Sequence, residues 1–132
     1  MALQDLTADM LTRIRNACRI RAKQVLVLNN KLNRGVADVL AKEGYIRGYE
    51  VIADGRQGLL RVDLKYGPRG EMLIHHMERV SRTGCRVYRS VEELPSPMSG
   101  LGIAIVSTSY GVMSDRECRE KRIGGEVVAT VG

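Results

Sequence analysis

The cluster Gly67, Pro68 and Gly70 divides this 132-residue sequence into two halves whose apolar residues follow different spacings. Glycine and proline in close succession interrupt regular structure, because proline cannot continue a helix and glycine stabilises neither helix nor strand. Helical and then alternating spacing precedes the cluster, and short strand-length runs follow it. The sequence therefore predicts an α+β fold, with an amino-terminal α/β subdomain (residues 1–66) packed on a carboxy-terminal β-rich subdomain with a short helix (residues 67–132).

The first half is expected to form helix, strand, helix, strand and strand in that order. Asp5 is positioned to cap the first helix, and Asn29 or Asn30 can cap a second helix that Gly44 ends. The apolar face of the first helix consists of Leu3, Leu6, Met10, Ile14 and Ala17. Val25–Leu28 has strand length, and a hairpin is expected to join residues 45–52 to the alternating segment 60–66.

The second half predicts mostly short strands and one short helix. Candidate strands are Met72–Met77, Cys85–Arg89, Ile103–Val106 and Val127–Val131, with a helical turn before Pro95. Ser114 and Glu117 have the spacing of a capping box, which favours a helix from there to Arg122. Gly124 is expected to end that helix.

Charge and composition indicate a polyanionic partner. The chain has 21 Lys and Arg against 15 Asp and Glu, a formal charge of +6, and no Phe or Trp, so its core must be aliphatic. Arginine predominates, and its guanidinium binds phosphate in a bidentate manner. Nucleic acid is favoured over an acidic membrane, because no amphipathic basic helix with aromatic anchors is present. No membrane-spanning or signal-peptide pattern is found either, so a cytoplasmic location is expected.

A search for catalytic motifs favours a protein that is not an enzyme. Phosphate-binding loops, HExxH and GxSxG motifs are missing, and the adjacent His75 and His76 would point to opposite faces of a strand. The three cysteines are far apart, which fits reduced structural thiols better than disulfides or a zinc site. Cys85 and Cys118 are interpreted as small buried apolar groups. We expect no catalytic residue, no metal site and no cofactor.

Three consecutive hydroxyl side chains, Ser107, Thr108 and Ser109, follow the apolar strand. A rigid row of short hydroxyls can hydrogen-bond to ribose 2′-hydroxyls and base edges in the shallow minor groove of RNA. An ordinary Ser/Thr turn would give the same pattern. Spacing alone leaves the two interpretations equally open.

Two further groups are compatible with RNA binding. Gly124 and Gly125 would let backbone amides approach a ligand, and Glu126 could accept from a base amino group, although a Gly-Gly helix stop is commonplace. Arg86 and Tyr88 share a strand face and could bind a phosphate and stack on a base, although arginines also keep edge strands soluble.

The first predicted helix ends in a dense run of cations. Arg13, Arg15, Arg19, Arg21 and Lys23 lie within eleven residues that contain no acid. Such residues suit the helix dipole and would also contact phosphates, but a solvated helix face looks similar.

Several motifs, in the same order along the chain, resemble bacterial small-subunit ribosomal protein eight. They are ADMLTRIRNA at residues 8–17, RVSRTGCRVY at 79–88, GLGIAIVSTS at 100–109, GVM at 111–113 and GGE at 124–126. The resemblance covers essentially the whole chain. It implies an amino-terminal α/β part and a carboxy-terminal β-rich part that binds RNA.

The resemblance also implies a function and partners. A member of this family is a primary 16S rRNA-binding protein that docks on the rRNA central domain and helps to assemble the platform of the small subunit. Neighbouring contacts with small-subunit proteins five and twelve would follow. Repression of its own operon, through an mRNA mimic of the rRNA site, is an alternative role.

Carried over from the family, the RNA-binding residues form four groups. They are Ser107, Thr108 and Ser109; Gly124, Gly125 and Glu126; Arg86 and Tyr88; and Thr12, Arg15 and Asn16 as a secondary contact. Three features depart from the family: Tyr110 replaces a usual lysine, Thr83 a usual proline, and the sequence ends without the usual aromatic residue. A small hydrolase that uses Ser107 or Cys118 is the remaining alternative, and it would require a histidine within reach.

Overall fold

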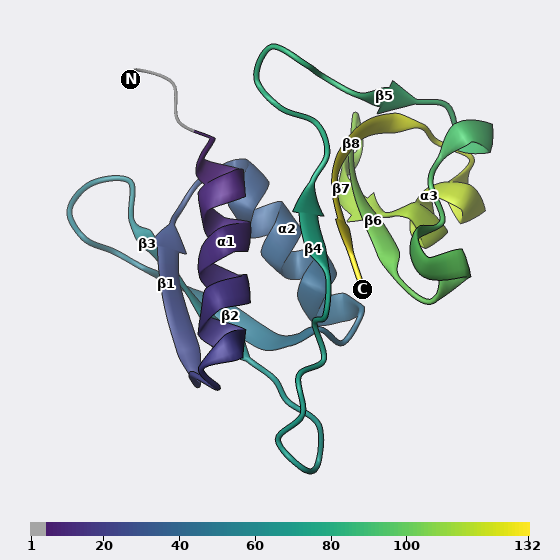
Figure 1. Ribbon diagram of the computed structural model, residues 1–132. Helices are drawn as coiled ribbons and strands as arrows, with labels where there is room; N and C mark the ends of the chain where they lie inside the picture. Colours follow the sequence, from purple (N-terminus) through teal and green to yellow (C-terminus); the bar gives the residue numbers. More distant parts are fainter. Residues whose placement is uncertain (1–4) are drawn as a thin grey trace. The chain divides into compact units, whose positions relative to one another are not determined.

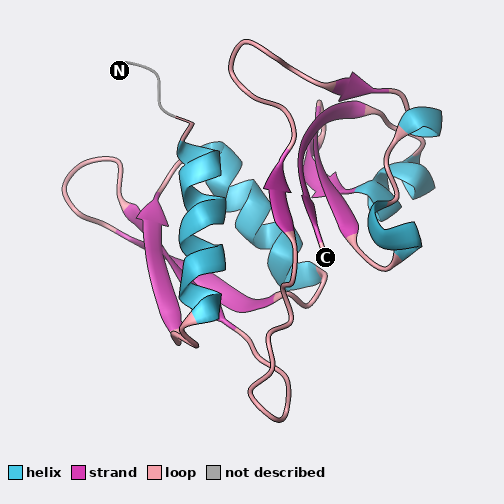
Figure 2. Cartoon of the chain, in the orientation of Figure 1, coloured by secondary structure: helices cyan, strands magenta, loops and turns pink. Residues whose placement is uncertain are grey.

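The computed structural model describes residues 5–132 and divides into two compact units, the first ending at Ile74 and the second comprising His75–Gly132 (Figure 1). Each unit has its own sheet, and the first carries two longer helices (Figure 2). The predicted α+β class is confirmed, as is the order helix, strand, helix, strand, strand in the first half. Gly67, Pro68 and Gly70 lie within the first unit, where the Gly70 amide donates to the Gly67 carbonyl at 2.9 Å.

The first unit is a three-stranded antiparallel sheet covered on one face by two helices. Its elements are α1 (Leu6–Arg19), β1 (Gln24–Leu28), α2 (Lys31–Lys42), β2 (Ile46–Ile52) and β3 (Leu59–Leu64). β3 lies between β1 and β2, and its residues Leu60, Val62 and Leu64 are buried while the alternate ones are half-buried. Because only one sheet face is buried, α1 and α2 both pack there, and the core is aliphatic as predicted.

Helix ends in the first unit follow the predicted chemistry. The Asp5 carboxylate accepts from the Ala8 amide at 3.0 Å, and the Asn30 side chain accepts from the Asn33 amide at 2.7 Å. Gly44, with φ +84°, follows α2 in the left-handed conformation that glycine adopts readily. Of the predicted apolar helix face, Leu3 lies outside the described residues.

The second unit is built around its last strand. Its elements are β4 (Met77–Arg79), β5 (Tyr88–Arg89), the 3-10 helices η1 (Val91–Glu93) and η2 (Pro97–Gly100), β6 (Ile103–Thr108), β7 (Gly111–Ser114), α3 (Asp115–Lys121) and β8 (Gly125–Val131). The sheet order is β4-β8-β6-β7, and β5 also pairs with β8. β8, drawn in yellow in Figure 1, therefore joins β4 and β5 to β6. Its Val127 packs with Val106, Met113 and Cys118 in the core.

Two predicted strands are much shorter than expected. In the segment 72–77 only Met77 belongs to a strand, because the His75 and His76 amides both donate to the Gly132 carbonyl, at 2.8 and 2.7 Å, and the backbone bends there. In the segment 85–89 only Tyr88–Arg89 pairs with β8, since Cys85 instead closes a turn with Arg82.

Three further details of the prediction are wrong. Cys85 is exposed because it lies in that turn, whereas Cys118 is buried as expected. Arg122, with φ 56°, is the left-handed residue that ends α3, so Gly124 does not have that role. Tyr66 lies beyond the end of β3 and forms only an isolated bridge with Met72.

Candidate nucleic-acid interface

The segment Ser107–Ser109, which we call the hydroxyl loop, comprises the last two residues of β6 and the first residue of a tight turn to β7. Thr108 pairs with Gly111, and the Thr108 hydroxyl donates to the Gly111 carbonyl at 2.8 Å and accepts from the Tyr110 amide at 3.1 Å. This hydroxyl therefore holds the turn itself. Among the described residues, no group receives a hydrogen bond from the Ser107 or Ser109 side chain, so their donors remain available to a ligand.

The second unit brings three of the predicted groups into one row across its sheet. Ser107 of β6 pairs with Glu126 of β8, and Glu126 pairs in turn with Tyr88 of β5. Directly opposed residues on antiparallel strands have their side chains on the same face. Ser107, Glu126 and Tyr88, which we call the Ser107 row, thus form a polar and aromatic strip. Tyr88 is 64% exposed, so its ring is open to stacking.

Glu126 is the hydrogen-bonding centre of this row. Its Oε2 accepts a short hydrogen bond from the hydroxyl of Ser81, which is fully buried, and lies 3.2 Å from Arg86 Nη1. The Ser81 hydroxyl also accepts from the Val87 amide at 3.1 Å. The carboxylate thus fixes Arg86 and the start of β5 beside β8. These contacts make Glu126 a positioning group for Arg86 and β5.

Gly124 and Gly125 are required by close backbone packing. A Cβ on Gly124 would clash with the Arg89 carbonyl oxygen and lie 2.9 Å from Ser90 Cα. A Cβ on Gly125 would clash with the carbonyl oxygen of Ser107. The glycines therefore let β5 and β6 approach β8, which brings the hydroxyl loop and the Arg86–Tyr88 segment together.

The buried carboxylate of Asp115, at the start of α3, supports β6. Asp115 is 2% exposed, accepts from the Ala104 amide at 2.9 Å and pairs with Arg119 at 2.5 Å. Arg119 in turn donates to the carbonyl of Pro95 and to the Ser96 hydroxyl, both at 2.8 Å. The pair thus ties the 94–96 segment and α3 to the strand that carries Ser107.

Thr12, Arg15 and Asn16 belong to α1 in the first unit. Their three- and four-residue spacing places them on one helix face, where Thr12 and Asn16 are exposed and Arg15 is half-buried. The structure thus groups these three residues on one face of α1.

Sequence reasoning missed Ser81 and Arg122 near the row, and it noted Arg89 only as one of several basic residues in the segment 79–89. Ser81 carries no sequence signal, because a single serine between arginines resembles any surface position. Arg89 pairs with Gly125, and the exposed Arg122 lies two residues before Gly124. The charge of both was visible in the sequence, but the place of Arg89 beside Gly125 depends on the pairing of β5 with β8.

The chemistry of the remaining groups does not suggest a reaction centre. Burial raises the pKa of the Cys118 thiol to about 11, so this thiol is neutral near pH 7 and a poor nucleophile. Within residues 5–132, no group of three or more His, Cys, Asp or Glu residues is placed to hold a metal ion.

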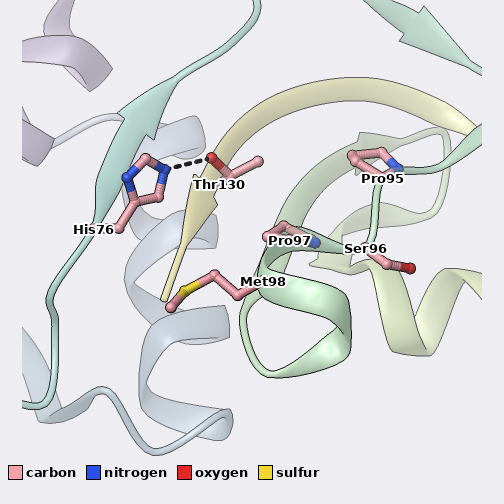
Figure 3. Close-up of a pocket in the computed structure, with 6 residues that line it drawn as sticks. All are labelled: His76, Pro95, Ser96, Pro97, Met98 and Thr130. Atoms are coloured by element: carbon pink, nitrogen blue, oxygen red, sulfur yellow. Dashed lines mark hydrogen bonds between the residues drawn. The ribbon is translucent and has the colours of Figure 1, made fainter.

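A hollow of about 460 Å³ lies in the second unit, apart from the Ser107 row (Figure 3). Its lining residues are His76, Pro95, Ser96, Pro97, Met98 and Thr130. His76 Nε2 and Thr130 Oγ1 are 3.2 Å apart at one side of it. The hollow is lined mainly by apolar groups and includes no residue predicted to bind RNA.

Comparison with known proteins gives consistent matches along the chain. The family model described as Ribosomal protein S8 matches residues 5–131. The "Small ribosomal subunit protein uS8" of Geobacillus kaustophilus is 50% identical over 131 residues, which cover 99% of each chain. The proteins of that name from Streptococcus equi subsp. zooepidemicus and Streptococcus pneumoniae are each 47% identical over the same share. None of the helices in residues 5–132 has the length and apolar character that a bilayer crossing requires.

Proposed function

The chain belongs to the ribosomal protein S8 family, and on that premise we propose that it is a structural constituent of the small ribosomal subunit. The family is structural and non-enzymatic. More specifically, we propose that the protein binds the central domain of 16S rRNA and helps to assemble the platform of the small subunit. Its location would be the cytoplasmic ribosome, with small-subunit proteins five and twelve as neighbours.

The Ser107 row is the observation that carries the RNA-binding proposal. The free hydroxyls of Ser107 and Ser109 can donate to ribose 2′-hydroxyls or base edges, and the exposed Tyr88 ring can stack on a base. Arg86 can bind a phosphate beside them. A strip of this kind recognises a local RNA fold by hydrogen bonding and stacking more than by charge alone.

The other predicted residues support the row in different ways. Gly124, Gly125 and Glu126 hold β5 and β6 beside β8, and the Thr108 hydroxyl stabilises the turn that presents Ser107 and Ser109. Thr12, Arg15 and Asn16 on α1 would form a secondary contact with the rRNA.

A titration of the full chain against an isolated central-domain rRNA fragment tests the proposal. The wild-type protein should bind this fragment more tightly than a scrambled RNA of equal length. Ser107→Ala should weaken binding to the cognate RNA by about 1–3 kcal/mol. The substitution removes the hydroxyl that would hydrogen-bond to the RNA, and it breaks no hydrogen bond within the protein. Thr108→Ala is the comparison variant, and it should also lower the free energy of unfolding. Equal affinity of the wild type for both RNAs would refute the proposal.

A translational repressor that binds an mRNA copy of the rRNA site is the second candidate. Its support is that the row lies within one small unit and would recognise the same local RNA fold in either molecule. Sedimentation through a sucrose gradient separates the two roles, because a ribosomal constituent co-sediments with small subunits.

A further inference from the structure

The strongest charged feature outside the Ser107 row lies at one end of the first unit. There the turn after α1 meets the loop that follows β3, although the two segments are far apart in the sequence. Arg21 Nε donates to the Gly70 carbonyl at 2.9 Å, and the Tyr66 hydroxyl donates to the Ala22 carbonyl at 2.5 Å. These contacts bring together two segments that carry four cations, and we call these cations the turn patch: Arg19, Arg21, Lys23 and Arg69.

The turn patch has a strong excess of positive charge. All four of its residues are exposed, and among the described residues no carboxylate forms an ion pair with any of them. Glu71 is the acid closest in sequence to Arg69, and its carboxylate accepts from the Arg69 backbone amide at 2.9 Å. The side-chain charges of the patch are therefore left to an external anion.

Helix-end electrostatics account for only part of this arrangement. A cation in the last turn of α1 stabilises the helix dipole, and Arg19 lies in that turn. The effect falls off within one turn, so it does not explain Lys23 or Arg69. Solvation alone also gives no reason for the Arg21 side chain to be bound to three backbone carbonyls.

Arg21 is the rigid member of the patch. Its backbone adopts a left-handed φ of 59°, and its Nη1 donates to the Cys18 and Arg19 carbonyls at 3.2 and 3.4 Å. Within residues 5–132 no acceptor is bound to Nη2, so the outer edge of the guanidinium keeps its donors. A guanidinium fixed in this way binds a phosphate without the entropy loss of ordering a free side chain.

We propose that the turn patch is a further RNA-binding surface, beyond the Ser107 row and the contact of Thr12, Arg15 and Asn16, and that it contacts the phosphate backbone of the RNA without reading its sequence. The inference rests on the proposed function, since it assumes an RNA ligand. The patch contains no aromatic ring, and its exposed Ile20 offers neither stacking nor hydrogen bonding to bases. Phosphate contacts of this type position an RNA, while base contacts in the Ser107 row would specify it.

The salt dependence of binding by the full chain tests the patch. Arg19→Gln combined with Arg69→Gln removes two charges and leaves Arg21, which caps α1. The matched control is Lys31→Gln combined with Arg56→Gln, which makes the same charge change at exposed sites. Lys31 and Arg56 lie near the end of the sheet where Leu28 pairs with Leu59, whereas the patch lies near the end where Gln24 pairs with Asp63.

With the central-domain rRNA fragment as probe, the patch variant should have a salt slope shallower by about 1–2 units, since each phosphate contributes about 0.7–0.9. Its affinity for the cognate and scrambled RNAs should fall by the same factor, and the control should keep the wild-type slope. Equal slopes for patch variant and control would overturn the inference. An unchanged RNA slope with lost binding to vesicles of anionic phospholipid would overturn it in favour of a membrane surface.

Failure of this inference differs from failure of the proposed function. If the wild type prefers cognate RNA but the patch variant keeps the wild-type salt slope, only the role of the turn patch is refuted. If the wild type shows no preference for cognate RNA, the proposed function fails whatever the patch variant does.

Discussion

Gly125→Ala should disrupt the pairing of β6 with β8, and with it the Ser107 row. The added methyl group would clash with the Ser107 carbonyl oxygen and lie 3.1 Å from the Ser107 carbonyl carbon and 3.2 Å from Val106 Cγ1. The first two atoms are backbone, so no side-chain rotation relieves the contact. The two strands must instead move apart at Ser107.

The magnitude follows from two opposing effects. Forcing a methyl group into a packed site costs about 1–3 kcal/mol. Replacing glycine by alanine also reduces the entropy of the unfolded chain, which stabilises by about 0.4–1 kcal/mol where the backbone conformation is compatible. Gly125 lies in β8 and lacks a left-handed φ, so this gain applies. We expect a net loss of about 1–2 kcal/mol in the free energy of unfolding.

Urea unfolding and RNA titration measure the two consequences. Gly48→Ala is the matched control, because Gly48 also lies in a strand without a left-handed φ and has no atom within 4 Å of the added Cβ. Gly48→Ala should leave stability unchanged or raise it, and should leave RNA binding unchanged. If Gly125→Ala is as stable as Gly48→Ala and binds the rRNA fragment with wild-type affinity, the packing argument is refuted.

Two further predictions concern the interior of the second unit. In the native protein the exposed Cys85 should react readily with a thiol reagent at pH 8. Cys118 should react only after unfolding in urea, because this thiol is buried and its pKa is raised to about 11. Equal reaction rates of the two cysteines in the native protein would contradict the burial of Cys118. Asp115→Ala should lower the free energy of unfolding by about 2 kcal/mol, because it leaves the Ala104 amide without its acceptor and Arg119 without its anion. This value allows for the partial exposure of Arg119, since solvent weakens the ion pair. An unchanged urea midpoint of the variant would contradict the prediction.

Local chemistry was predictable from the sequence. The caps at Asp5, Asn30 and Ser114 depend on a side chain and an amide three residues away, so a short window of sequence contains all the information. The hydroxyl loop was expected after a strand that ends at Val106, but β6 continues to Thr108. The loop's internal use of Thr108 could not be predicted, because that depends on where the Gly111 carbonyl points.

Contacts between distant segments were not predictable. The sequence suggested that Gly124 and Gly125 admit a ligand, but their Cβ positions are filled by the backbone of other strands. The position of Ser81 beneath Glu126 depends on the pairing of β5 with β8, and the turn patch depends on the contact of Arg21 with Gly70. The segment 72–77 looked like a strand because apolar residues predominate at its ends, yet its amides bond to the Gly132 carbonyl.

The position of β8 within its sheet has a consequence for the order in which the protein can form during synthesis. The first unit has all its strands within residues that leave the ribosome early, so it can fold while the rest of the chain is still being made. The second unit cannot, because β4, β5 and β6 meet only through residues 125–131. A nascent or truncated chain that lacks this segment would have a folded first unit but no Ser107 row. The Ser107 row would thus form only after residues 125–131 have been synthesised, because both Ser107 and Tyr88 are aligned by pairing with Glu126.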